Sequence, residues 1–175
     1  MQNQKIESKS KYPKPEADEF RRFAKSIGYE PNDIQYFIKA FDFQKIRNKH
    51  DGKNRNNFVH SAMGTVGDAL LKFVIAEYLY PCGDKGTITI EKEKYEKNET
   101  LLEIAREHGF ECLYYDESGT HDTGKLPSEI PEVPDQFEAT VYAIYLDLGL
   151  PGVREWVREW FIDVAKDIIK NNVSE

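Results

Sequence analysis

The most apolar part of this chain is the segment Phe58–Tyr80, and one aspartate, Asp68, lies inside it. The segment is too long and too continuous for a β-strand of this kind. After Ala69 its apolar residues cover nearly the whole circumference of a helix, which is typical of a helix without a solvent-exposed face. We therefore predict that this segment forms the central buried helix of the fold.

Most other apolar residues recur at helical spacing, and glycines and prolines mark where the helices end and begin. The stretch Thr87–Lys94 alternates enough to suggest a strand, so its periodicity alone leaves helix and strand open. Two polar stretches, Asn48–Asn57 and Phe110–Val133, are predicted loops, and a loop as long as the second is more often functional or mobile than idle. The predicted helices are Ala17–Ile27, one that begins near Pro31, Phe58–Tyr80, Asn98–His108, Pro134–Leu148 and one that begins at Pro151.

Length and composition fit one domain of a globular protein. The chain has 175 residues, enough for one core and too few for two comfortable ones. Residues 1–15 are polar and rich in lysine, which predicts a disordered arm ahead of a domain that spans residues 16–171. The sequence contains neither an apolar run of the roughly 18–20 residues that a membrane helix needs nor an apolar signal peptide. Cys82 and Cys112 suggest neither a metal pair nor a disulfide scaffold, so we expect a cytoplasmic protein without a membrane partner.

Charge alone says little about partners. The formal net charge of −7 argues against a protein that holds nucleic acid through its total charge. Local clusters of lysine and arginine still bind phosphates in an acidic protein. Because the chain has 31 aspartates and glutamates, a single carboxylate is usually a solvated surface group.

Three acidic residues differ from this background because they lie within apolar helices. Asp68 has apolar residues and glycine as its neighbours, and Asp135 and Glu138 share one helix face at i and i+3. Burial of a carboxylate is costly unless it is paired or bound to a metal, so acids on two such helices suggest a divalent-cation site with oxygen ligands. Alternatively, Asp135 and Glu138 complement the helix dipole and Asp68 forms an ion pair. Spacing alone favours these structural roles without excluding the metal site.

Four segments, in order, resemble the catalytic domain of the ribonuclease III family. VGDALLKFVIAEYLY (Val66–Tyr80) is similar to the family's most distinctive motif, which ends in Gly-Asp-Ala ahead of an apolar helix. DQFEATVYAIYLDLGL (Asp135–Leu150) resembles its second motif. GTITIEKEKYEKNETLLEIAREHGFE (Gly86–Glu111) and IGYEPNDIQYFIKAF (Ile27–Phe41) are similar to the intervening and opening parts of the domain. The resemblance covers most of the chain, from about Phe20 to Phe161, and it is specific because its parts occur in the same order as in the family.

The resemblance implies an all-α fold, the helical bundle of a ribonuclease III endonuclease domain, in which Thr87–Lys94 is helical. It implies Mg²⁺-dependent hydrolysis of phosphodiesters in double-stranded or structured RNA, with Mn²⁺ as an alternative ion and with 5′-phosphate and 3′-hydroxyl ends as products. On the matching positions, Asp68, Asp135 and Glu138 are the catalytic residues and the metal ligands.

The resemblance also implies a homodimer whose two active sites line one RNA-binding valley. Val66, Phe73 and the apolar face of the last helix are candidates for burial in such a dimer. Packing within the core of one chain explains the same residues equally well.

The chain departs from the bacterial enzymes at two motif positions. Those enzymes carry two glutamates ahead of the motif aspartate, and this chain has Ser61 and Gly64 there. Under one interpretation, the three remaining acids suffice to bind Mg²⁺, and water fills the coordination position that a glutamate would otherwise take. The Mini-ribonuclease III group, which also departs from the glutamate at this position, is a precedent for activity. Under the competing interpretation, the domain is catalytically impaired and acts as an RNA-binding or assembly scaffold. Close helix packing across Gly64 and Gly67 is a structural reason for the change.

We expect the catalytic domain to act without a double-stranded RNA-binding domain, so that RNA binding depends on the dimer valley and on local charge. Lys92, Lys94 and Lys97 are the candidate RNA contacts, and the loop Lys49–Arg55 is a second candidate. The alternative for these lysines is a solvated helix face interleaved with glutamates. Binding through such contacts should be weak and sensitive to salt.

Overall fold

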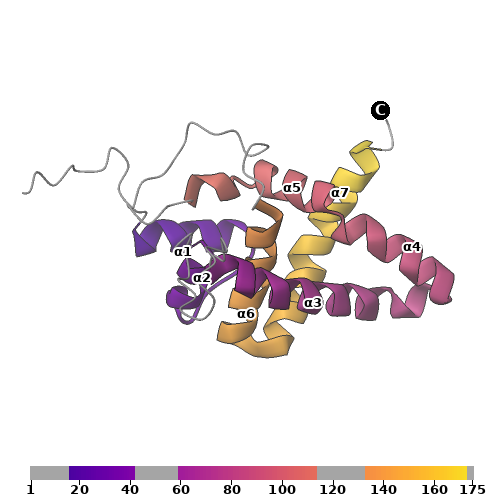
Figure 1. Ribbon diagram of the computed structural model, residues 1–175, viewed down its shortest axis with the longest axis horizontal. Coiled ribbons are helices and arrows are strands. Elements are labelled where there is room, and N and C mark those ends of the chain that lie inside the picture. Colours follow the sequence, from indigo (N-terminus) through magenta and orange to yellow (C-terminus); the bar gives the residue numbers. More distant parts are fainter. Residues whose placement is uncertain (1–15, 42–58, 114–132, 173–175) are drawn as a thin grey trace, which may run out of the picture.

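The structure, a computed structural model, describes residues 16–41, 59–113 and 133–172, without the side chains of 59–61, 82, 111 and 112. Every regular element in these ranges is helical, so the all-α prediction is confirmed there (Figure 1). The predicted arm 1–15, the predicted loop Asn48–Asn57 and most of the predicted loop Phe110–Val133 lie outside the described residues. The described helices are α1 (Ala17–Ser26), α2 (Ile34–Ala40), α3 (Val59–Leu79), α4 (Lys85–Glu96), α5 (Asn98–Glu107), α6 (Val133–Trp156) and α7 (Ile162–Asn172).

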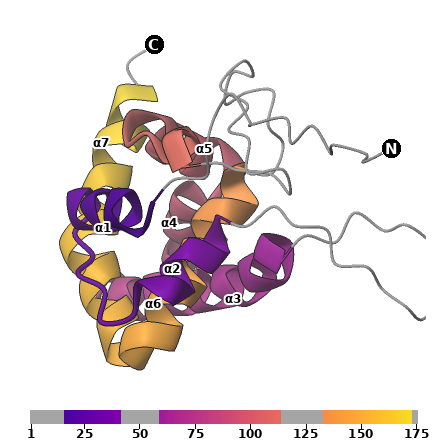
Figure 2. The same cartoon turned by 90° about the vertical axis from the view of Figure 1, so that its left-hand side faces the viewer.

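Helices α3 and α6 form the centre of the fold and make its most extensive helix–helix contact. In Figure 1, α3 runs along the molecule and α4 returns beside it, so these two helices form one end, and α1 and α2 lie at the other end. Helix α6 also contacts α2 and α5, and α5 contacts α7. Figure 2, which looks from the end with α1 and α2, shows α2 in front of α6.

Helix α3 is central, as predicted, but it is not buried on all sides. One side packs into the core through Leu71, Val74 and Ile75. The other side exposes Val66 and Phe73, whose exposed fractions are 41% and 49%. The prediction of full burial was wrong because periodicity reports which surface is apolar and not what covers it. Across the three described ranges, no helix combines the length and apolarity needed to span a membrane.

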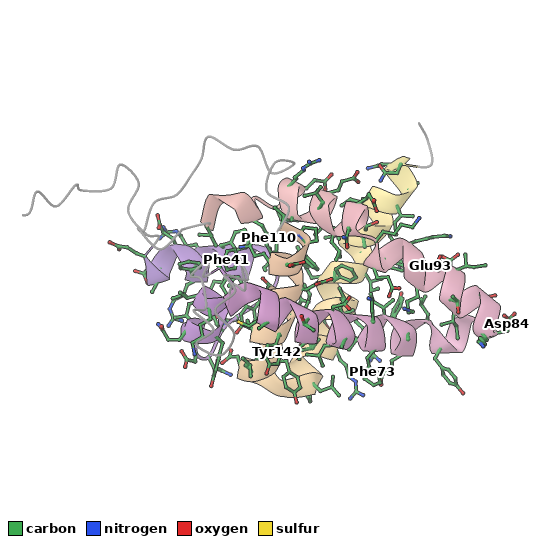
Figure 3. All side chains as sticks on the ribbon, viewed as in Figure 1. Phe41, Phe73, Asp84, Glu93, Phe110 and Tyr142 are labelled. Carbon is green, nitrogen blue, oxygen red and sulfur yellow. The ribbon has the colours of Figure 1, made fainter. Side chains whose placement is uncertain are left out.

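A cluster of buried aromatic rings joins the first two helices to α6. Phe20 of α1 lies 5.6 Å from Phe41 between ring centroids, and Phe41 lies 6.1 Å from Phe110. Figure 3 labels Phe41 and Phe110, which lie near one another. Phe110, in the short 3₁₀ turn after α5, packs against Phe137 of α6 at 5.4 Å between ring centroids. Each such pair contributes about 0.5–1.5 kcal/mol beyond its buried area. The cluster therefore holds the first turns of α6 in place.

One carboxylate of α6 fixes the connection between α1 and α2. Asp147 accepts hydrogen bonds from the Tyr29 hydroxyl and from the backbone N–H groups of Asn32 and Asp33, each at 2.8 Å. Burial and the bond to Asp147 raise the pKa of the Tyr29 phenol. This aspartate of the second motif is therefore engaged in holding the fold together.

Aspartate caps set where two helices begin. The Asp33 carboxylate accepts a hydrogen bond from the Gln35 N–H at 2.9 Å, so α2 begins after Asp33 and not near Pro31 as predicted. The Asp84 carboxylate accepts from two backbone N–H groups in the first turn of α4, at 2.7 and 3.2 Å. Helix α4 then includes the whole of Thr87–Lys94, which confirms the helix that the family resemblance implied.

Gly149 interrupts α6 with the non-helical angles φ 68° and ψ −171°. Glycine adopts this left-handed φ without steric cost, so the predicted end of the helix after Leu148 is confirmed and a new helical stretch follows with Pro151. This stretch continues through the π-helical segment Val157–Phe161 into α7. Core packing accounts for its apolar stripe. The stripe's buried members include Val153, Trp156, Val157, Phe161 and Ile168.

Two glycines of α3 permit the close crossing with α6. A Cβ atom added at Gly64 would lie 2.7 Å from the carbonyl oxygen of Asp135, and one added at Gly67 would overlap the carbonyl oxygen of Glu138. Because glycine has no Cβ atom, the two helix backbones approach one another directly. The close packing offered as the structural reason for Gly64 is confirmed.

We expect Gly67→Ala to destabilise the fold more than Gly64→Ala, although alanine is the better helix former by about 1 kcal/mol. Overpacking should lower the free energy of unfolding of Gly64→Ala by about 1–3 kcal/mol. The loss should be larger for Gly67→Ala, because its Cβ would meet backbone atoms that cannot rotate away. Urea unfolding followed by circular dichroism measures both losses. The control, Ala69→Gly on the exposed side of α3, should cost about 1 kcal/mol. A Gly67→Ala variant as stable as the wild type would contradict the crossing.

Candidate active site

The crossing of α3 and α6 carries the predicted site residues. Asp68 directly follows Gly67 on α3, and Asp135 and Glu138 lie in the first two turns of α6. The backbone carbonyls of those two acids lie against Gly64 and Gly67. The two helices therefore bring their acidic residues to one place.

Glu138 shows how near the three carboxyl groups are. Burial, the negative charges of Asp68 and Asp135 and a hydrogen bond with Asp68 together raise the pKa of Glu138 to about 8, and Lys72 opposes this shift. Asp135 is exposed, whereas Asp68 and Glu138 are half-buried, so the cluster opens to solvent at Asp135.

The described side chains do not form a ready-made metal cage. Within residues 16–41, 59–113 and 133–172, no group of three Asp, Glu, His or Cys residues is arranged to hold an ion. Asp68 instead binds Lys72, whose Nζ lies 2.8 Å from Oδ1 and 2.8 Å from Oδ2. Mg²⁺ keeps several waters and is commonly bound by one or two protein carboxylates together with substrate phosphates. The neighbouring carboxylates of Asp68 and Glu138 fit that chemistry.

The two altered motif positions lie on the first turns of α3. At Gly64 the backbone of Asp135 occupies the space that a side chain would need, so a longer residue would require the helices to separate. Ser61 lies three residues earlier in the same helix, and its side chain lies outside the described part of the structure.

Two of the three candidate RNA-contacting lysines pair within α4. The Nζ atom of Lys92 lies 2.6 Å from Glu96, and that of Lys94 lies 2.6 Å from a glutamate one turn earlier. Lys97 is exposed and ends the helix. For Lys92 and Lys94 this arrangement matches the alternative of a helix face with interleaved charges. The second candidate, the loop Lys49–Arg55, lies outside the described residues.

Sequence reasoning missed two charged residues around the site. Lys72 follows Asp68 at i+4, a spacing that predicts an ion pair on one helix face. Glu96 interacts electrostatically with Lys72 because α4 returns beside α3. No local sequence pattern predicts that interaction. A further pair joins the centre of the fold, where Arg154 of α6 donates two hydrogen bonds to Glu77 of α3 at 2.7 Å each.

Comparison with known proteins gives the family. The Ribonuclease III domain family matches residues 61–149, a range that includes all three acidic residues. Ribonuclease 3 of Colwellia psychrerythraea is 30% identical over 144 residues, which are 80% of this chain and 50% of that protein. Ribonuclease 3 of Mycoplasmoides pneumoniae is 30% identical over 176 aligned residues, covering 98% of this chain and 58% of that protein. The chain belongs to the ribonuclease III family, and it spans little more than half the length of these relatives.

Two solved structures of the ribonuclease III nuclease domain from Campylobacter jejuni have the same fold. One aligns with a TM-score of 0.62 at 19% identity and covers 85% of this chain and 96% of that domain. The other aligns with a TM-score of 0.57 at 20% identity, covering 88% and 95%. The predicted fold class is therefore confirmed. The first of these structures is described as showing flexibility in a region involved in dimer formation.

The raised pKa of Glu138 makes stability depend on pH. The carboxyl group has a pKa of about 8 in the folded protein and an ordinary value of 4.5. The folded state keeps a proton on Glu138 that the unfolded state releases above pH 4.5. The contribution of this protonated carboxyl group to the free energy of unfolding is therefore full below pH 4.5 and is lost as the pH rises to about 8. In EDTA, Glu138→Gln should therefore be more stable than the wild type above that window, by about 1–3 kcal/mol after allowance for partial exposure.

Urea unfolding of both proteins on either side of this window measures the effect. Below the window the two proteins should be equally stable, because both then carry a neutral side chain at position 138. If the free energies of unfolding of the two proteins differed by the same amount at every pH, the Glu138 carboxyl group would not be crowded by its neighbours.

Proposed function

We propose that this domain hydrolyses phosphodiester bonds in double-stranded or structured RNA with the help of a divalent cation. Membership of the ribonuclease III family and the nuclease-domain fold support the reaction class. The observation that carries the proposal for this chain is the close crossing of α3 and α6, which places the backbones of Asp135 and Glu138 against Gly64 and Gly67 beside Asp68. The raised pKa of Glu138 agrees with this crowding of acids. Acids gathered in this way repel one another, and a bound cation relieves that cost.

Asp68 and Glu138 would hold Mg²⁺ or Mn²⁺, with Asp135 completing the acidic set at the exposed edge. When bound, the ion supplies an activated water and stabilises the leaving oxygen. Glu138 must give up its proton to serve as a ligand, and its pKa of about 8 makes that release part of the binding. Water would complete the coordination of the ion in place of the carboxylates that Ser61 and Gly64 do not supply.

We also propose that the domain forms a homodimer through the exposed side of α3. Val66, Ala69 and Phe73 lie on one stripe of the helix, spaced by three and four residues, and all three are exposed. Figure 3 shows Phe73 at the outer edge of α3. A continuous apolar stripe on a folded domain marks an interaction site. The dimer-forming region described for the Campylobacter domain supports a second copy of this chain as the occupant.

Double-stranded RNA would then lie across the two sites of the dimer. Among the candidate lysines, Lys97 is the most accessible to a phosphate, since it is exposed at the end of α4. Lys92 and Lys94 would first have to leave the glutamates that they bind. Contacts of this kind depend on salt because each releases counterions from the RNA.

A scaffold that binds RNA without cleaving it is the second candidate. The contacts of Lys72 with both oxygens of Asp68 favour the scaffold, because this carboxylate already has a cationic partner. The lack of a ready-made three-ligand group among the described side chains favours it as well. Both functions use the same fold and the same RNA, so only the chemistry separates them.

Incubation of the purified protein with long double-stranded RNA and Mg²⁺ or Mn²⁺ should give shorter duplexes with 5′-phosphate ends, seen on a gel. Asp68→Asn and Glu138→Gln should each lower the rate by about 100-fold or more, because each removes a proposed metal ligand. Asp163→Asn, at an exposed acid of α7, is the control and should cleave at the wild-type rate. Absence of cleavage at high enzyme concentration, with RNA binding retained, would select the scaffold.

The proposed dimer is tested by Phe73→Glu, which places a charge in the middle of the apolar stripe. Light scattering after size-exclusion chromatography should show a dimer for the wild type and a monomer for the variant, with unchanged helicity by circular dichroism. Ile90→Glu changes another exposed apolar residue, 60% exposed on α4, and should leave the dimer intact. A wild type that stays monomeric at high concentration would exclude this interface.

A further inference from the structure

Lys72 lies on α3 one turn after Asp68, and its ammonium group contacts both oxygens of that carboxylate at 2.8 Å. The side chains are partly accessible, with exposed fractions of 44% for Lys72 and 33% for Asp68. A lysine on a helix surface has a long, flexible stem, so its ammonium group can leave the carboxylate without disturbing the core.

Acids from three helices face this ammonium group. Besides Asp68 on its own helix, Glu138 of α6 and Glu96 of α4 attract it. Glu96 is itself bound by Lys92 at 2.6 Å, with exposed fractions of 16% for the glutamate and 24% for the lysine. Lys72 thus pairs directly with one of the proposed metal ligands, and Lys92 holds the neighbouring acid of α4 in a partly buried ion pair.

A divalent ion and Lys72 need the same oxygens. An ion that binds Asp68 either displaces the ammonium group or shares the carboxylate with it, and in both cases the positive charge of Lys72 repels the ion. We propose that Lys72 is a positioning residue that competes with the divalent cation for Asp68 and thereby lowers the affinity of the site for that cation. This inference rests on the metal site of the proposed function and concerns what regulates its occupancy.

The competition predicts that removal of the positive charge tightens metal binding. Titration of Mn²⁺ into the purified protein without RNA, followed by calorimetry, gives the dissociation constant independently of cleavage. Lys72→Met and Lys72→Gln should each bind Mn²⁺ roughly tenfold more tightly than the wild type, because the competitor is gone and the site is more negative by one charge. Lys72→Arg keeps the charge and should stay within about twofold of the wild type.

Two further variants show whether the effect acts through Asp68. Lys25→Met removes a lysine from the other end of the fold, where it pairs with Glu30 at 3.0 Å, and it controls for the change in total charge. It should leave the dissociation constant unchanged. Asp68→Asn combined with Lys72→Met should lose the gain in affinity, which a double-mutant cycle expresses as coupling between the two positions.

The outcomes separate this inference from the proposed function. Wild-type protein that binds Mn²⁺, with no tightening in Lys72→Met or Lys72→Gln, would overturn the competition and leave the metal site in place. Equal tightening in Lys25→Met would overturn it too, because total charge would then be the cause. No saturable binding by the wild type or by either neutral variant would overturn the metal site and, with it, the role of Lys72.

Discussion

The distance between the backbones of α3 and α6 governs everything else in this fold. Gly64 and Gly67 leave no side chain between the two helices, so their peptide groups meet directly. The aromatic cluster around Phe110 and Phe137 holds the beginning of α6, and Asp147 holds its later part against the α1–α2 connection. With both parts fixed, the register of α6 along α3 is fixed as well, and with it the place where the acids meet.

That placement brings negative charges close together, and Lys72 on α3 reduces their repulsion. Burial beside two other acids makes the charged form of Glu138 costly, and its pKa rises accordingly. The positive charge of Lys72 reduces this cost, and the negative charges of Asp68 and Glu96 stabilise the ammonium group of Lys72. The cluster therefore holds its charges in a balance that a proton, the lysine or a divalent ion can each shift.

Local patterns were sufficient to predict most of the helices. Gly28, Gly109 and Gly149, where α1, α5 and the first part of α6 end, all adopt a positive φ, which is the property that makes glycine a stop signal. Helix α4 was the ambiguous case, and the family resemblance decided it where periodicity did not. The start of α2 was misplaced because Asp33 caps the helix, so Pro31 lies before the first helical turn and not within it.

The site was predictable only in part. The resemblance pointed to Asp68, Asp135 and Glu138, and the structure brings them together. The exposure of Val66 and Phe73 and the approach of Glu96 to Lys72 depend on which helices become neighbours. Neighbours far apart in sequence leave no period for sequence analysis to detect, so these features became visible only in three dimensions.

The glycine at position 64 also constrains how this lineage can change. A single codon change to glutamate would place a Cβ atom 2.7 Å from the carbonyl oxygen of Asp135, so the helices would have to part before the new acid could be accommodated. Parting them would move Asp135 and Glu138 away from Asp68. A glutamate at position 64 would therefore need compensating changes elsewhere at the crossing of α3 and α6.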